Sequence, residues 1–159
     1  QLHKMFEKYG EVTNAKTLAK TIIEQRFIKP FTTINNFKQS ISAVVKGNPN
    51  KYLAQVFQAL RIEVNEEMKV LEEMLEQTKT VLNKDGRLAV ITFHSLEDRV
   101  VKNFFKNGSI LEQEADDVYG TRAENPFNII TKKPIVASVK EQKINKRSRS
   151  AKLRVAQKK

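Results

Sequence analysis

The chain has 159 residues, enough for one ordinary domain, and carries a formal net charge of +11 with a pI of about 9.9. It has no cysteine, which excludes disulfides and cysteine–metal sites. No apolar run is long enough to span a bilayer, and the first residues do not resemble a signal peptide, so we expect a cytoplasmic protein with no membrane partner.

Residues 1–50 are predicted to form three helices and a loop. The first helix ends before Gly10, and the second opens at Asn14 and stops before Pro30. The predicted buried side of the second helix consists of Leu18, Ile22, Ile23 and Phe27. Thr32 and Thr33 lead into the third helix, and residues 47–50 are predicted to form a loop.

A long helix is predicted from Tyr52 to Leu82, because apolar residues recur there with alternating gaps of three and four. The apolar stripe consists of Phe57, Leu60, Val64, Met68, Leu71, Leu75, Thr78 and Leu82. Arg61 and Asn65 flank it one turn apart, so we expect both to be partly buried. They could serve packing and local hydrogen bonding, or could contact an anionic or amide-bearing ligand.

The segment Leu88–Phe93 is an almost continuous apolar run, which predicts a strand of a parallel sheet covered by helices on both faces. His94 and Ser95 follow at its carboxyl end, where open α/β sheets bind their ligands. Ser95 is predicted to cap the next helix, with Asp98 answering it three residues on. The cap could be purely structural, and His94 could simply bond neighbouring backbone.

Residues 107–126 are predicted to form an irregular loop, followed by strands at Ile129–Ile130, Ile135–Val139 and Leu153–Ala156. A strand buried on both faces needs neighbours on both sides, and every other predicted strand comes later in the chain. The five glycines are also too far apart for a G-x-G cofactor loop. These observations predict the back half of an α/β domain.

Positive charge is concentrated at the carboxyl end. Residues 132–159 hold eleven Lys and Arg against one acid, Glu141, whereas residues 1–131 are almost neutral. A local basic block favours a polyanionic partner, nucleic acid first, although a solvated tail without a partner has the same composition.

Three blocks carry a family resemblance: GRLAVITFHSLEDRVVKNFF at 86–105, FQALRIEVNEEM at 57–68 and NKRSRSAKLRVAQKK at 145–159. They resemble the ribosomal RNA small-subunit methyltransferase H family, also called MraW. The segment KPFTTINN at 29–36 is similar to the helical domain that this family carries as an insertion. Three positions depart from the family pattern, since Asp85 replaces a glycine, Lys146 a proline and Gln55 an arginine.

The resemblance implies a cytoplasmic enzyme that uses S-adenosyl-L-methionine to methylate the exocyclic N4 of a cytidine in small-subunit (16S) ribosomal RNA. The implied fold class is α/β: the C-terminal half of a Rossmann-like methyltransferase domain, residues 54–159, plus most of an inserted helical domain, residues 1–53. The family's main cofactor-binding motifs have no counterpart here, so we assign no cofactor-binding residue to this chain and expect no metal. The oligomeric state is left open.

Two kinds of site residue are assigned within this resemblance. The expected catalytic residues are His94 and Ser95. The expected RNA-binding residues are Arg61 and Asn65 beside the nucleotide, and Arg147, Arg149, Lys152 and Arg154 on phosphates. The main alternative is a non-catalytic basic RNA-binding module, and a structural coiled-coil protein is weaker because the apolar stripe lasts only about four heptads.

Overall fold

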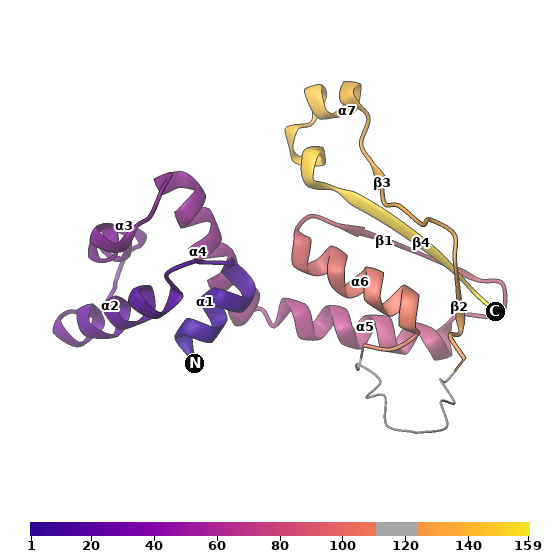
Figure 1. Cartoon of the computed structure of the whole chain (residues 1–159), viewed down its shortest axis with the longest axis horizontal. Helices are drawn as coiled ribbons and strands as arrows, with labels where there is room; N and C mark the ends of the chain where they lie inside the picture. Colours follow the sequence, from indigo (N-terminus) through magenta and orange to yellow (C-terminus); the bar gives the residue numbers. More distant parts are fainter. Residues whose placement is uncertain (111–123) are drawn as a thin grey trace. The chain divides into compact units, whose positions relative to one another are not determined.

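The computed structural model describes residues 1–110 and 124–159 and divides them into two compact units, Gln1–Glu67 and Met68–Lys159 (Figure 1). The expected domain boundary between residues 53 and 54 falls inside a continuous helix of the first unit. The assignment of residues 1–53 to the inserted helical domain therefore stays a prediction. No helix among the described residues is long and apolar enough to cross a membrane.

The first unit is helical, and its elements are α1 (Leu2–Gly10), α2 (Ala15–Ile28), α3 (Ile34–Ser40), the short 3₁₀ helix η1 (Ser42–Val44) and α4 (Pro49–Val64). Its first three helices follow the predicted order, but α4 begins at Pro49, inside the loop predicted at 47–50. Gly10 permits close packing of α1 on α4, because a Cβ there would lie 2.8 Å from the carbonyl oxygen of Gln55. The buried core includes Phe6, Leu18, Ile41 and Val56.

Asn14 begins α2, as predicted, but its side chain does more than cap the helix. Its amide donates to the carbonyl of Val44 at 2.8 Å, and its Oδ1 accepts from the hydroxyl of Tyr52 at 3.0 Å. Burial raises the pKa of Tyr52, which keeps the hydroxyl protonated as a donor. Asn14 therefore fastens the start of α2 to η1 and α4.

The predicted buried side of α2 is only half correct. Leu18 and Ile22 are buried, but Ile23 is exposed and Phe27 is 93% exposed. Helical periodicity selects the side that carries Leu18 and Ile22, which packs into the core. Ile23 lies about 100° further round the helix, and Phe27 follows it one turn later. No described element covers either side chain.

The predicted long helix is two helices, α4 and α5 (Glu67–Val81). The chain breaks at Asn65 and Glu66, and Glu66 takes a left-handed backbone conformation with φ 50°. Periodicity did not reveal the break, because apolar spacing continues across it without a glycine or proline. Arg61 and Asn65 are exposed rather than partly buried, so that expectation is wrong.

The second unit is a small antiparallel sheet with helices α5 and α6 packed on one face. Its elements are β1 (Arg87–Thr92), α6 (Ser95–Asn107), β2 (Phe127–Ile129), β3 (Ile135–Val136), α7 (Val139–Ile144), η2 (Lys146–Ser150) and β4 (Lys152–Lys158). The strand order is β1-β4-β2, and β3 also pairs with β4. The core brings Leu75 of α5 and Phe104 and Phe105 of α6 onto Phe127 of β2.

The expectation of a parallel strand covered on both faces is wrong for the described residues. β1 pairs with β4 alone, in antiparallel register from Arg87 opposite Gln157 to Thr92 opposite Lys152. Its burial alternates, with Val90 on the helix-covered face and Ile91, 58% exposed, on the other. β1 is thus an edge strand with an open apolar face, and the unit is mixed α and β.

The end of the chain follows the prediction in part. β4 confirms the predicted last strand and extends it, whereas the strand predicted at Ile135–Val139 is only β3, and Val139 begins α7. Most of the loop predicted at 107–126 lies outside the described residues. Gly108, with φ 73°, ends α6 in a left-handed cap.

Candidate functional site

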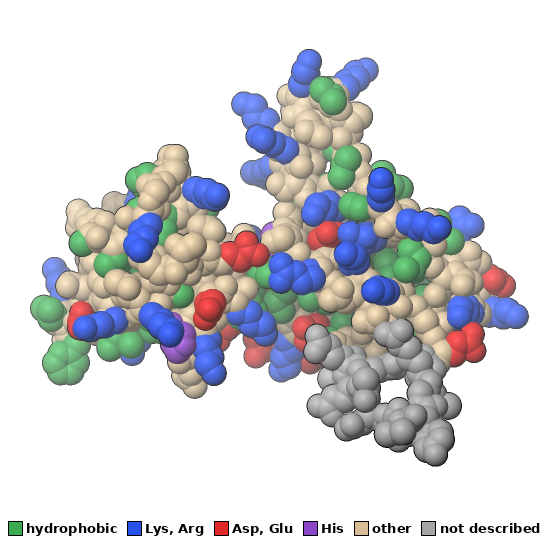
Figure 2. Space-filling view, viewed as in Figure 1, with side chains coloured by type: hydrophobic (Ala, Val, Ile, Leu, Met, Phe, Trp, Pro, Cys, Tyr) green, Lys and Arg blue, Asp and Glu red, His purple; other side chains and the backbone are tan. Residues whose placement is uncertain are grey.

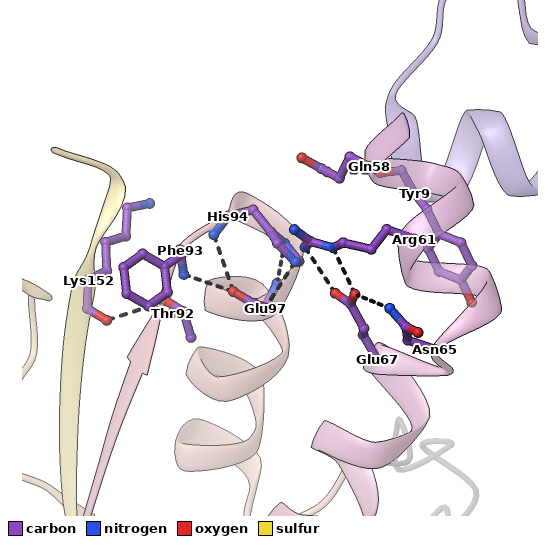
Figure 3. A network of polar contacts seen from close by, with 10 residues as sticks. All are labelled: Tyr9, Gln58, Arg61, Asn65, Glu67, Thr92, Phe93, His94, Glu97 and Lys152. Atoms are coloured by element: carbon purple, nitrogen blue, oxygen red, sulfur yellow. Dashed lines mark hydrogen bonds and ion pairs between the residues drawn. The ribbon is translucent and has the colours of Figure 1, made fainter. Parts of the chain in front are cut away.

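The carboxyl end of β1 leads directly into α6 through a reciprocal hydrogen-bonded cap. His94, not Ser95, is the capping residue: its Nδ1 accepts from the backbone N–H of Glu97 at 3.3 Å. The Glu97 carboxylate accepts in return from the N–H of Phe93 at 2.8 Å and of His94 at 3.3 Å (Figure 3). The predicted Ser95–Asp98 pair is therefore wrong by one residue: the capping pair is His94 and Glu97, and Asp98 instead accepts from Lys152 and Arg154.

This cap fixes the tautomer of His94. Because Nδ1 accepts a hydrogen bond, the ring hydrogen of the neutral imidazole belongs on Nε2. Nε2 is buried and lies 3.2 Å from Oε1 of Glu97, without the angles of a hydrogen bond. Burial alone would raise the pKa of Glu97, but the hydrogen bonds from His94 and Phe93 outweigh it and lower that pKa. In this arrangement the His94 ring holds the start of α6 to the end of β1.

Replacing His94 with alanine is expected to lower the free energy of unfolding by about 1 kcal/mol, the usual loss for a removed helix cap. His94→Asn should keep most of the stability, because asparagine is a good capping residue. Urea unfolding followed by far-ultraviolet circular dichroism measures both. Ser95→Ala is the matched control, since Ser95 is exposed and should change stability by less than about 0.5 kcal/mol; an equal loss in both alanine variants would contradict the cap.

One turn further along α6, Asp98 joins the helix to β4. Its carboxylate accepts from Nε and Nη2 of Arg154 at 2.7 and 3.2 Å and from Nζ of Lys152 at 3.3 Å. The Arg154 guanidinium holds the pKa of Asp98 below its usual range. Burial raises this pKa and the hydrogen bond from Lys152 lowers it, but the contact with Arg154 has the largest effect. Arg154 is buried, so it is not among the cations exposed to a partner, whereas Lys152 remains part-exposed.

Arg61 and Asn65 form a polar cluster with Glu67 at the end of α4 in the first unit. Nε and Nη2 of Arg61 donate to the two carboxylate oxygens of Glu67 at 2.8 and 3.0 Å, and the Asn65 amide donates to Glu67 at 3.3 Å (Figure 3). The two residues lie together, as their spacing predicted. Their partner within the chain is an acid, so an anionic ligand would have to compete with Glu67 for Arg61.

The segment 139–150, which we call the basic arm, consists of α7 and η2 and extends beyond the sheet of the second unit (Figure 1). Its cations are Lys140, Lys143, Lys146, Arg147 and Arg149, against the single acid Glu141, and all are exposed (Figure 2). The side chain of Asn145 accepts from the backbone N–H of Arg147 at 3.1 Å, and its backbone carbonyl accepts from Oγ of Ser148 at 2.7 Å. Buried Ser148 thus separates two outward-facing arginines.

The structure therefore separates the predicted phosphate contacts into two groups. Arg147 and Arg149 are exposed and have no ion pair within the described ranges 1–110 and 124–159. Lys152 and Arg154 are held by Asp98, a residue whose position in the sequence predicted only a helix cap. One signal was available: Arg154 alternates with Leu153 and Val155 in the last strand, on the same face as buried Ala156.

A family model described as the MraW methylase family matches residues 1–159. The chain belongs to this family of methyltransferases. Among curated proteins it is similar to ribosomal RNA small subunit methyltransferase H of Azobacteroides pseudotrichonymphae, 50% identical over 99% of this chain and 52% of that protein. It is 48% identical to the protein of the same name from Flavobacterium psychrophilum, over 99% of this chain and 54% of that protein.

A third relative of the same name, from Cytophaga hutchinsonii, is 45% identical over 98% of this chain and 52% of that protein. The chain thus spans about half the length of the curated relatives it matches. The family resemblance drawn from the three sequence blocks is confirmed.

Proposed function

We propose that this chain contributes the end of β1, with His94 and Ser95, and the basic arm to an enzyme that methylates the exocyclic N4 of a cytidine in 16S ribosomal RNA. The observation that carries the proposal is the match to the MraW methylase family along the whole chain. The basic arm supports a polyanionic substrate, because its exposed cations lie outside any ion-pair network among the described residues.

The methyl donor in this proposal is S-adenosyl-L-methionine, but the described residues do not form a cradle for it. A Cβ on Gly10, Gly86 or Gly108 would meet the chain's own atoms at 2.5 to 2.8 Å, so these glycines serve internal packing. Gly47 has nothing within 4 Å of its Cβ position. We therefore propose that residues outside this sequence hold the cofactor.

The open edge of β1 also supports the proposal that residues outside this sequence complete the enzyme. Among the described residues only β4 pairs with β1, and the apolar side chains of Ile91 in β1 and of Phe93 just after it are exposed; proteins usually cover such an edge. We propose that further strands pair with β1 in the complete enzyme, which would make residues 54–159 the C-terminal half of a Rossmann-like domain. Residues 1–53 would then form most of the helical insertion.

The proposed roles follow from the chemistry of cytosine. Its N4 lone pair is delocalised into the ring, so the enzyme must align N4 and bind its hydrogens. We propose His94 and Ser95 at the pocket floor, with His94 fixing the strand end through its cap on α6 and the hydroxyl oxygen of exposed Ser95 accepting a hydrogen of N4. Arg61 and Asn65 would lie beside the nucleotide, and Arg147, Arg149 and part-exposed Lys152 would bind phosphates; Arg154 is no longer included.

The test uses a complete enzyme that contains this sequence, a radiolabelled methyl donor and small-subunit ribosomal RNA. Digestion to nucleosides and chromatography should show label in N4-methylcytidine. His94→Ala should reduce transfer, whereas full transfer by that variant would remove the site assignment. RNA binding without any transfer would instead favour the alternative, a non-catalytic basic RNA-binding module.

A further inference from the structure

An aromatic surface on the first unit is not explained by packing. Phe27 is 93% exposed near the end of α2, although aromatic side chains usually contribute to cores. It lines a surface hollow of about 530 Å³ together with Ile23, Arg26, Pro30 and Phe31. We call these five residues the Phe27 platform.

The platform has a fixed base. The Phe31 ring packs edge-on against Phe37 with centroids 5.4 Å apart, and Phe37 packs against Phe57 of α4 at 5.8 Å. Pro30 fixes the backbone between Phe27 and Phe31. A partner that contacts Phe27 would therefore meet a surface already anchored to the helical core, with little ordering needed beyond the Phe27 side chain.

Two cations adjoin the platform. Arg26 is part of it and Lys29 is exposed beside it, and neither has an ion pair in the described part of the chain. The neighbouring acid on α2, Glu24, lies 3.8 Å from Lys20. An exposed aromatic ring flanked by unpaired cations is the combination that binds single-stranded nucleic acid, where bases stack and phosphates are neutralised.

We propose that the Phe27 platform stacks an unpaired base of an RNA strand, with Arg26 and Lys29 on the adjacent phosphates. The inference rests on the proposed function for its choice of RNA as the partner. It adds a contact that reads single-strandedness rather than sequence, because every base has a face that can stack. Charge favours this partner over a protein, because Arg26 and Lys29 have no ion pair among the described residues and a polyanion supplies the complementary charge.

The experiment measures binding of a short single-stranded RNA that carries one 2-aminopurine, whose fluorescence falls when the base stacks. For the 159-residue chain, Phe27→Ala should weaken binding about tenfold and restore the fluorescence. Phe27→Tyr should retain both, because tyrosine keeps the ring. Arg26→Gln with Lys29→Gln should reduce the salt dependence of binding, which Phe27→Ala should leave unchanged.

Ile28→Ala is the matched control, because Ile28 is the next residue, apolar and 77% exposed. Equal affinities for Phe27→Ala and Ile28→Ala, with RNA still bound, would overturn the platform and leave the proposed function intact. Failure of the unaltered chain to bind RNA would overturn the platform and count against the proposed substrate. A change in sedimentation with unchanged RNA affinity in Phe27→Ala would assign the surface to a second copy and also overturn the proposal.

Discussion

Replacing Asp98 with asparagine is expected to lower the free energy of unfolding of the second unit by about 3 kcal/mol, a larger loss than the one expected for His94→Ala. The side chains of Arg154 and Asp98 are only 8% and 12% exposed, and their contacts are the bidentate pair of α6 and β4. Removing the carboxylate leaves the guanidinium buried without a compensating charge. Urea unfolding followed by circular dichroism measures the loss, and hydrogen exchange should show it first in β4.

A double-mutant cycle separates the pair from the loss of a single side chain. Replacing both partners, as Asp98→Asn with Arg154→Met, should recover much of the lost stability, because no unpaired charge remains buried. Asp85→Asn is the matched control, since Asp85 is exposed and its carboxylate accepts a hydrogen bond from Gln157 at the other end of the sheet. If Asp98→Asn were no more destabilising than Asp85→Asn, the pair would not hold α6 to β4.

The same pair predicts a dependence on pH. The pKa of Asp98 is lower in the folded chain than in the unfolded chain, chiefly because Arg154 donates to its carboxylate. Its contribution to stability is therefore complete above the unfolded pKa of about 3.9 and is lost as the pH falls through the lower, folded value. Asp98→Asn should consequently flatten the acid side of the stability profile.

Local signals in the sequence predicted the elements that local chemistry determines. Asn14 and Pro30 bracket α2, Thr33 caps α3, and the strand predicted at Leu153–Ala156 is part of β4. The break between α4 and α5 was missed because apolar spacing continues through Asn65. Periodicity reports which residues share a side of a helix, but it does not report where the helix stops or what covers that side.

The same limit explains the errors at the site. A continuous apolar strand predicts cover on both faces, yet β1 has a covering layer on one face only among the described residues. The prediction placed the cap at Ser95 because serine is a common capping residue and histidine is not. Only the contact between His94 and Glu97, which the structure shows, identifies His94 as the cap. The Asp98–Arg154 pair joins residues 56 positions apart, which no single-sequence spacing could reveal. Because of this pair, the basic segment at the end of the chain contains both a buried structural cation, Arg154, and exposed cations such as Arg147.

Substituting both exposed arginines of the basic arm, Arg147→Ala with Arg149→Ala, is expected to weaken RNA binding by about tenfold at moderate salt. Each arginine that binds a phosphate releases about one counterion, so the slope of log affinity against log salt should fall by about two. The fold should persist, because both side chains point away from buried Ser148. Fluorescence anisotropy with 16S ribosomal RNA fragments over a series of salt concentrations measures affinity and slope together.

Arg87→Ala is the matched control for the arm, because Arg87 is also an exposed arginine of the second unit but begins β1, opposite Gln157 near the far end of the register. If charge alone governed binding, this substitution would lower the slope as much as either arm substitution does. A localised arm predicts instead that Arg87→Ala changes little and that Lys152→Ala, which removes a part-exposed cation held by Asp98, has an intermediate effect. The order of these three slopes therefore distinguishes a phosphate-binding arm from a uniformly basic surface.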